Sequence, residues 1–246
     1  MSLAIFLGLY LLINQAYCQR NVTIHGNISI GYYYIDVYVG TPPQRKSLIL
    51  DTGSRQTVMT CELCEKCGNH WNEPFLVSES QTVDILTKNQ TNFDWQCSFS
   101  DDDKKCSFRS SYLEGSSYAG YVIKDTFLFR NELNITTNIT KTHLFGCAVE
   151  ETGEFASQAA DGIIGFGPYS QETFLESPTL LEVEFRDKRI SSKVFSICLG
   201  NNGGQLMIGD WNSNRHLPGE QPIYLDSSDV SWNQSYNVEL SGIKVK

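Results

Sequence analysis

Short runs of β-branched and aromatic residues alternate along the chain with turns rich in glycine, proline and asparagine. The runs are residues 29–39, 46–50, 118–129, 143–149, 194–199 and 205–208. Such side chains suit the pleated, half-buried surface of a sheet, and the intervening residues are those that turns require. The pattern therefore predicts a mostly β fold.

Helical patterning is confined to one segment. Ser177 places a capping hydroxyl before Pro178, and hydrophobic residues then follow at mostly helical spacing. We expect a helix over residues 178–189, and one or two short helices in all.

The first hydrophobic run, residues 3–13, differs from the others because it is followed by small residues and not by a turn. Eleven residues are too few to span a bilayer, which takes about 20. The run is typical of a signal peptide, with cleavage before Gln19 and residues 1–18 removed. The alternative is a buried strand or helix that opens the domain.

Composition narrows the class of protein. The 246 residues are 41% hydrophobic and 19% charged, enough apolar material for a sizeable core. A net charge of −9 argues against binding to nucleic acid or to an anionic membrane surface. No second long hydrophobic run follows, so we expect no membrane anchor in this chain.

Six Asn-X-Ser/Thr triplets indicate a chain that enters the secretory pathway. They begin at Asn21, Asn27, Asn89, Asn134, Asn138 and Asn233. Secretion, a vacuole or lysosome, and the endoplasmic reticulum lumen all remain open as destinations.

The number of cysteines is consistent with the secretory pathway, because its oxidising lumen favours disulfides. Beyond Cys18 in the signal peptide there are seven: Cys61, Cys64, Cys67, Cys97, Cys106, Cys147 and Cys198. We expect at least two disulfides among the first five. A zinc site is disfavoured, since ligands at three-residue steps from Cys61 to His70 could hardly close a tetrahedron. We therefore expect no metal and no cofactor, and His70 becomes an ordinary surface or turn histidine.

The tetrapeptide Asp51-Thr52-Gly53-Ser54 directly follows the hydrophobic run at residues 48–50. A carboxylate at the end of a buried strand is costly unless N–H groups and hydroxyls bond to it. Thr52 and Ser54 supply such donors, and Gly53 lets the main chain turn back beneath the carboxylate. A capped turn with local hydrogen bonds is the alternative interpretation.

Together with residues 34–44 (YIDVYVGTPPQ), this tetrapeptide resembles the pepsin-like aspartic proteases. Three further segments match in order: residues 112–116 (YLEGS), residues 161–165 (DGIIG) and residues 194–209. The resemblance implies that Asp51 is catalytic. It also implies that Tyr112 and Gly115 form the flap hairpin over the cleft, and that Asp161, Gly162 and Gly165 support the catalytic loop from behind.

The match extends to the cysteine-rich branch of that family, which includes the nepenthesins and plasmepsin V. Its cysteine insert resembles residues 61–106, and Phe145-Gly146-Cys147 fits as well. The same resemblance places Cys147 and Cys198 on neighbouring strands and so suggests a bridge between them. The implied fold is a pepsin-like N-terminal lobe over residues 19–232, followed by a linker and the first strand of a truncated second lobe over residues 233–246.

The resemblance implies an aspartic-type endopeptidase, in which two aspartates, one from each lobe, share a proton. Asp51 is the only aspartate here in an Asp-Thr-Gly or Asp-Ser-Gly triplet. We therefore expect this form to be inactive as a monomer, with truncation of a longer enzyme as the first explanation. A homodimeric protease and a non-catalytic secreted peptide-binding protein are the alternatives.

Overall fold

The computed structural model describes residues 20–88, 90, 97–99, 104–130, 142–168, 178–210, 236 and 242. The predicted signal peptide and the triplets at Asn89, Asn134, Asn138 and Asn233 lie outside these residues. So does nearly all of the expected second-lobe strand. Within the described residues no helix has the length and apolarity needed to span a membrane.

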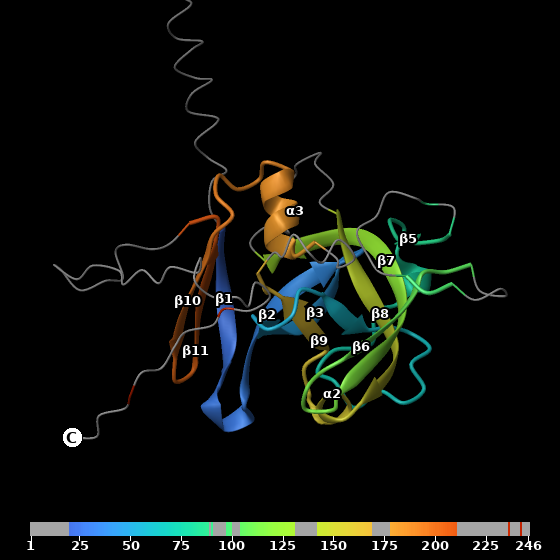
Figure 1. Ribbon diagram of the computed structural model, residues 1–246, viewed down its shortest axis with the longest axis horizontal. Helices are drawn as coiled ribbons and strands as arrows, with labels where there is room; N and C mark the ends of the chain where they lie inside the picture. The colour runs from blue at the N-terminus through green and yellow to red at the C-terminus, as the bar shows by residue number, and fades with distance from the viewer. Residues whose placement is uncertain are drawn as a thin grey trace, which may run out of the picture.

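Eleven strands form one sheet, drawn in Figure 1 with β10, β11 and β1 on one side and β5 to β8 on the other. The strands are β1 (Arg20–Asn27), β2 (Tyr32–Val39), β3 (Gln44–Asp51), β4 (Val58–Thr60), β5 (Asp84–Ile85), β6 (Ser107–Ser111), β7 (Ser117–Phe129), β8 (Thr142–Thr152), β9 (Gly162–Gly165), β10 (Phe195–Gly200) and β11 (Gly203–Ile208). Their order is β10-β11-β1-β2-β3-β9-β4-β8-β7-β5, with β6 also on β7 and a further pairing of β2 with β7.

Helices are short, as expected for a mostly β fold. They are α2 (Glu154–Ser157), α3 (Leu180–Arg186) and two 3₁₀ turns, η1 (Ile28–Ile30) and η2 (Val77–Glu79). The predicted helix at 178–189 is therefore shorter than expected and begins later. Its cap is Thr179, whose hydroxyl accepts from the Glu182 N–H while the Glu182 carboxylate accepts from Thr179 N–H, a capping box.

The centre of the sheet is built by strand β9, which lies between β3 and β4. It pairs in parallel with β3 and antiparallel with β4. The fit is close enough to require glycine: a Cβ at Gly162 would lie 2.1 Å from the Val58 carbonyl oxygen, and one at Gly165 would lie 2.4 Å from the Arg55 carbonyl carbon. Strand β9 therefore lies directly beside the end of β3, with Gly165 in register with Asp51.

The hydrophobic core divides into two clusters on this sheet. The larger includes Ile35, Leu48 and Ile164 from the central strands, and the smaller includes Val58 and Phe108 beneath the β6–β7 hairpin. All six predicted strands are present, as β2, β3, β7, β8, β10 and β11. The first starts only at Tyr32, because η1 and Gly31, at a φ of 84°, interrupt it.

Three disulfides join six of the cysteines. They are Cys61–Cys147, Cys64–Cys67 and Cys97–Cys106. Two of the three fall within residues 61–106, which confirms that expectation. The bridge expected between Cys147 and Cys198 is wrong, because Cys147 lies in β8 beside Met59 of β4, where Cys61 of the same chain segment reaches it. Cys198 lies exposed on β10.

Candidate active site

Asp51 is the last residue of β3, and the chain turns immediately after it. Its Oδ1 accepts a hydrogen bond from Gly53 N–H at 2.8 Å, and its Oδ2 accepts one from the Ser54 hydroxyl at 2.5 Å. Both carboxylate oxygens are thus held by the residues that directly follow, as the tetrapeptide predicted. Such bonds fix the orientation of a carboxylate.

The segment after β9 holds this loop from behind. Phe166 N–H donates to the Asp51 carbonyl at 2.7 Å, and Gly167 N–H donates to the Ser54 carbonyl at the same distance. Arg55 anchors the other side of the loop, with its guanidinium donating to the Pro168 carbonyl at 2.7 Å and to Glu182 of α3 at 2.8 Å. The carboxylate therefore sits on a rigid support.

Strands β6 and β7 form a hairpin whose turn is residues 112–116. Tyr112 N–H donates to the Ser116 carbonyl at 2.9 Å, and Gly115 N–H donates to the Tyr112 carbonyl at 3.0 Å. Gly115 has a φ of 98°, the left-handed conformation that glycine adopts without strain. Leu113 at the tip is fully exposed.

Tyr112 turns from this hairpin toward the Asp51 loop. Its hydroxyl lies close enough to Ser54 and Asp51 for both to affect its pKa, and its ring meets Phe155 edge-on at 4.9 Å. Burial raises the pKa of Tyr112 well above its ordinary value of 10, and the nearby Asp51 adds to the effect. The phenol therefore stays protonated and presents a neutral group near the Asp51 loop.

Asp161 lies behind the loop and is almost fully buried. Its Oδ2 accepts from Ser47 N–H of β3 at 2.5 Å and from the Asn72 side-chain amide at 2.6 Å, and its Oδ1 accepts from Asn72 N–H at 2.9 Å. These bonds connect the cysteine-rich insert to the strand that ends in Asp51. The placement fits the supporting position expected for Asp161, Gly162 and Gly165.

His70 is not the surface histidine that the sequence suggested. Its Nε2 lies 3.0 Å from Glu151 Oε2, and the two side chains are 5% and 0% exposed. The other Glu151 oxygen accepts from the Thr60 hydroxyl at 2.5 Å. Burial lowers the pKa of His70, but the hydrogen bond and charge of Glu151 outweigh it, and the net pKa is raised.

Two positions near Asp51 were missed by reasoning from sequence. Phe155 of α2 packs between Tyr112 and Tyr118, with its ring stacked 4.0 Å from the latter. Gln56 accepts a hydrogen bond from Ser110 of β6, which joins the Asp51 loop to the hairpin. Only a tertiary fold brings these residues together, so no local pattern marks them.

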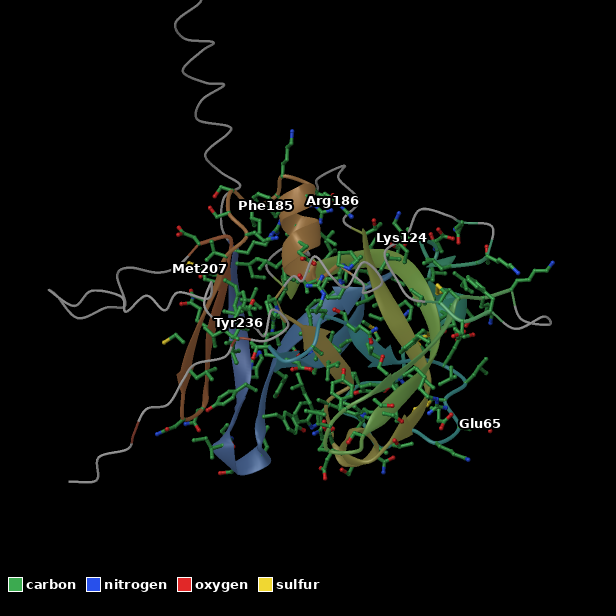
Figure 2. All side chains as sticks on the ribbon, in the orientation of Figure 1. Glu65, Lys124, Phe185, Arg186, Met207 and Tyr236 are labelled. Carbon is green, nitrogen blue, oxygen red and sulfur yellow. A yellow bond between two sulfur atoms is a disulfide. The ribbon has the colours of Figure 1, made fainter. Side chains whose placement is uncertain are left out.

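Tyr236, where the expected second-lobe strand begins, contacts the support of the loop. Its hydroxyl donates to the Phe166 carbonyl at 3.2 Å, and its ring meets Phe195 of β10 at 5.9 Å. The Tyr236 side chain is labelled in Figure 2. Metal binding is not supported by the cysteine-rich insert, because Cys61, Cys64 and Cys67 all form disulfides. No group of three or more ligand residues gathers elsewhere in the described residues.

A β lobe that holds an Asp-Thr-Gly carboxylate at the end of a central strand, beneath a tyrosine-bearing hairpin, defines the N-terminal lobe of an aspartic protease. Residues 33–210 match the family model described as "Xylanase inhibitor N-terminal". The chain belongs to the pepsin-like aspartic protease family.

Among curated proteins, plasmepsin V of Plasmodium falciparum is 32% identical over 221 residues, which are 88% of this chain and 36% of that protein. Aspartic protease 5 of Toxoplasma gondii is 33% identical over 196 residues, 74% of this chain and 20% of that protein. Syncephapepsin of Syncephalastrum racemosum is 29% identical over 217 residues, 87% and 47% respectively. The chain thus spans less than half the length of these relatives.

Proposed function

We propose that this chain is the N-terminal lobe of an aspartic endopeptidase and that Asp51 is one of its two catalytic carboxylates. The observation that carries the proposal is the Asp51 loop itself. Its carboxylate is oriented by Gly53 and Ser54 and faces the neutral phenol of Tyr112. A ring that closes over the site would exclude water from a bound peptide.

The chemistry requires a second carboxylate close to the first. Two such groups cannot both ionise, so they share one proton: the ionised one takes a proton from water, and the protonated one polarises the peptide carbonyl. The water oxygen attacks the carbonyl carbon, and the proton passes to the leaving amine. Since no other Asp-Thr-Gly or Asp-Ser-Gly triplet occurs here, the partner would come from further residues of a longer chain or from a second copy.

Asp51→Asn tests this proposal, because it keeps the size of the side chain and removes the charge. In a form that contains both carboxylates we expect at least about a 10³-fold loss of peptide hydrolysis, of the order seen when one member of a catalytic unit is removed. Unfolding free energy should change little. The measurement is cleavage of a denatured protein at acidic and neutral pH, with and without pepstatin. Full activity of the Asp51→Asn variant would contradict the proposal.

The 246-residue chain alone distinguishes the source of the second carboxylate. A proven monomer should show no turnover, since a single carboxylate cannot both activate water and polarise the carbonyl. Turnover that rises with the square of protein concentration would indicate a homodimer that brings two Asp51 residues together. Pepstatin-sensitive turnover by the monomer would overturn the two-carboxylate mechanism.

A non-catalytic binding protein is the second candidate, and the family description favours it, because that description names an inhibitor and not a protease. In that case the cleft would bind a polypeptide without cleaving it. The two candidates differ in one respect that can be measured: a form with both carboxylates would release cleaved peptide if it is a protease, and would bind and release the peptide intact if it is a binding protein.

We also propose that the protein works in the lumen of the secretory pathway. The three disulfides support this, because disulfides form and persist in oxidising compartments.

A further inference from the structure

Four aromatic rings form a continuous row on the surface, well away in sequence from the Asp51 loop. His25 of β1 stacks on Tyr34 of β2 at 5.4 Å, Tyr34 meets Trp71 at 4.5 Å, and Trp71 meets Tyr32 at 6.1 Å. We call these four residues the aromatic row. Trp71 is 45% exposed, and the other three rings are partly exposed. None of them has a role in the proposed hydrolysis.

The register of β1 on β2 puts an asparagine at the end of this row. Asn27 lies directly opposite Tyr32, and His25 lies directly opposite Tyr34. Directly opposite residues of an antiparallel pair project from the same face of the sheet, with their Cβ atoms roughly 4.5–5.5 Å apart. Asn27 and the aromatic row therefore share one face.

The side chain of Asn27 is held by its oxygen. Its Oδ1 accepts hydrogen bonds from Ser29 N–H at 2.9 Å and Ile30 N–H at 3.2 Å. Within the described residues, Nδ2 donates no hydrogen bond. Asn27 begins an Asn-Ile-Ser triplet, and Ile28 and Ser29 beside it are exposed.

We propose that Asn27 carries an N-linked glycan whose first N-acetylhexosamine packs on Tyr32 and Trp71. The donor would be a lipid-linked oligosaccharide diphosphate. The bond from Asn27 Nδ2 to the anomeric carbon forms, the bond from that carbon to the diphosphate oxygen breaks, and the amide proton leaves with the diphosphate. This inference is independent of the proposed catalysis.

The row suits a sugar because a pyranose has an apolar C–H face and a rim of hydroxyls. The C–H face can lie on Tyr32 and Trp71 and remove their exposed faces from water, while the hydroxyls stay solvated. The covalent tether places the sugar there without a cost of association. Trp71 belongs to the cysteine-rich insert and its N–H donates to the Ala159 carbonyl, so the glycan would fasten the insert to the β1–β2 hairpin.

Peptide mapping and thermal unfolding of the 246-residue chain, produced in a eukaryotic secretory host, test the proposal. The Asn27 peptide should carry the mass of the glycan. Ser29→Ala removes the triplet but keeps the backbone N–H that caps Asn27. We expect this variant to lower the Tm by about 2–4 °C, the shift that one aromatic packing contact gives in a domain of this size.

Removing one ring at a time distinguishes packing of the sugar on the aromatic row from a general effect of glycosylation on the Tm. In a Trp71→Leu or Tyr32→Leu background, Ser29→Ala should lower the Tm by less than half as much. Thr23→Ala, which removes the triplet at Asn21 on the same strand, is the matched control, and its effect should be the same in every background. Nuclear Overhauser contacts between the first sugar and the Trp71 ring would provide the second measurement. An unoccupied Asn27, equal Tm losses in all backgrounds, or absence of those contacts would overturn the proposal.

Discussion

At the scale of single residues, the pKa values of two buried histidines are shifted in opposite directions. His70 is paired with Glu151, which raises its pKa. His143 of β8 has its ring edge against Phe127 at 5.4 Å, and burial lowers its pKa to about 3, with Arg189 and Arg186 adding to the effect. The stability of the lobe should therefore depend on pH through both residues, with opposite sign.

The His70→Gln variant tests the buried pair. Because the folded pKa of His70 is raised, its contribution is complete below the unfolded pKa of about 6.5 and is lost as pH rises through the folded pKa. The stability difference between the parent and His70→Gln should therefore be largest near pH 5 and shrink above pH 7. At its largest it should approach the roughly 3–5 kcal/mol cost of breaking a buried ion pair.

Urea unfolding of the two proteins between pH 5 and pH 8 provides the measurement. His143 is present in both and cancels in the difference, although it lowers the stability of each as pH falls below about 6.5. A stability difference that does not vary with pH would mean that His70 acts only by packing.

The local hydrogen bonds of the Asp51 carboxylate could be predicted from sequence, but the His70–Glu151 pair could not. The Asp51 carboxylate accepts hydrogen bonds from residues two and three positions further along the chain, so a single tetrapeptide contains all the residues involved. The partner of His70 is 81 residues distant and reaches it only after β8 and the insert have packed together. A cysteine-rich context made a surface histidine the simplest interpretation, and it was wrong.

At the scale of elements, two glycines allow the contributions of two places to stability to be compared: the β6–β7 turn and the passage of β9 between β3 and β4. Gly115→Ala meets no atom within 4 Å but must keep a φ of 98°, which costs about 1–2 kcal/mol. Gly162→Ala would bring its Cβ to 2.1 Å from a backbone oxygen, so β9 would have to leave its place between β3 and β4. We expect its loss of stability to exceed that of Gly115→Ala.

Thermal unfolding of both variants, with far-ultraviolet circular dichroism to establish folding, provides the measurement. The comparison is informative because only Gly162 is packed against a neighbouring backbone. Equal losses, or a larger loss for Gly115→Ala, would contradict the packing described for β9.

Strands with a strong content of aromatic and β-branched residues were predictable from sequence, whereas strands held mainly by pairing with distant strands were not. Strand β7 was predictable because its 13 residues, Ser117–Phe129, are rich in aromatic and β-branched side chains. Strand β1 was missed because its pattern is mixed with Arg20, Asn21 and Gly26, and it is held by pairing with β11 and β2. The α3 cap was misplaced by two residues, since both Ser177 and Thr179 carry a capping hydroxyl.

At the scale of the whole molecule, the disulfides differ in how much of the chain they restrain. Cys61–Cys147 closes a separation of 86 residues, and Cys64–Cys67 closes one of 3. In the chain-entropy description, the first constrains the unfolded chain by about 4–5 kcal/mol and the second by about 2 kcal/mol. Replacing Cys61 and Cys147 by alanine should therefore destabilise the lobe more than replacing Cys64 and Cys67.

Denaturant unfolding of the two double variants measures this difference. Both remove two sulfur atoms, so each is the size control for the other. Because Cys61 and Cys147 are fully buried, part of their loss will be packing. A larger loss for the Cys64–Cys67 variant would contradict the ranking.

The long disulfide also has a consequence for how the chain is made. Synthesis proceeds from the N-terminus, so Cys64, Cys67, Cys97 and Cys106 all emerge before Cys147, the partner that Cys61 needs. During that interval Cys61 is exposed to four incorrect partners, two of them within six residues. Thiol–disulfide exchange can correct such mispairing. Yield in a cell should accordingly depend on its disulfide isomerase capacity, and translation rate through residues 107–147 becomes a variable of folding.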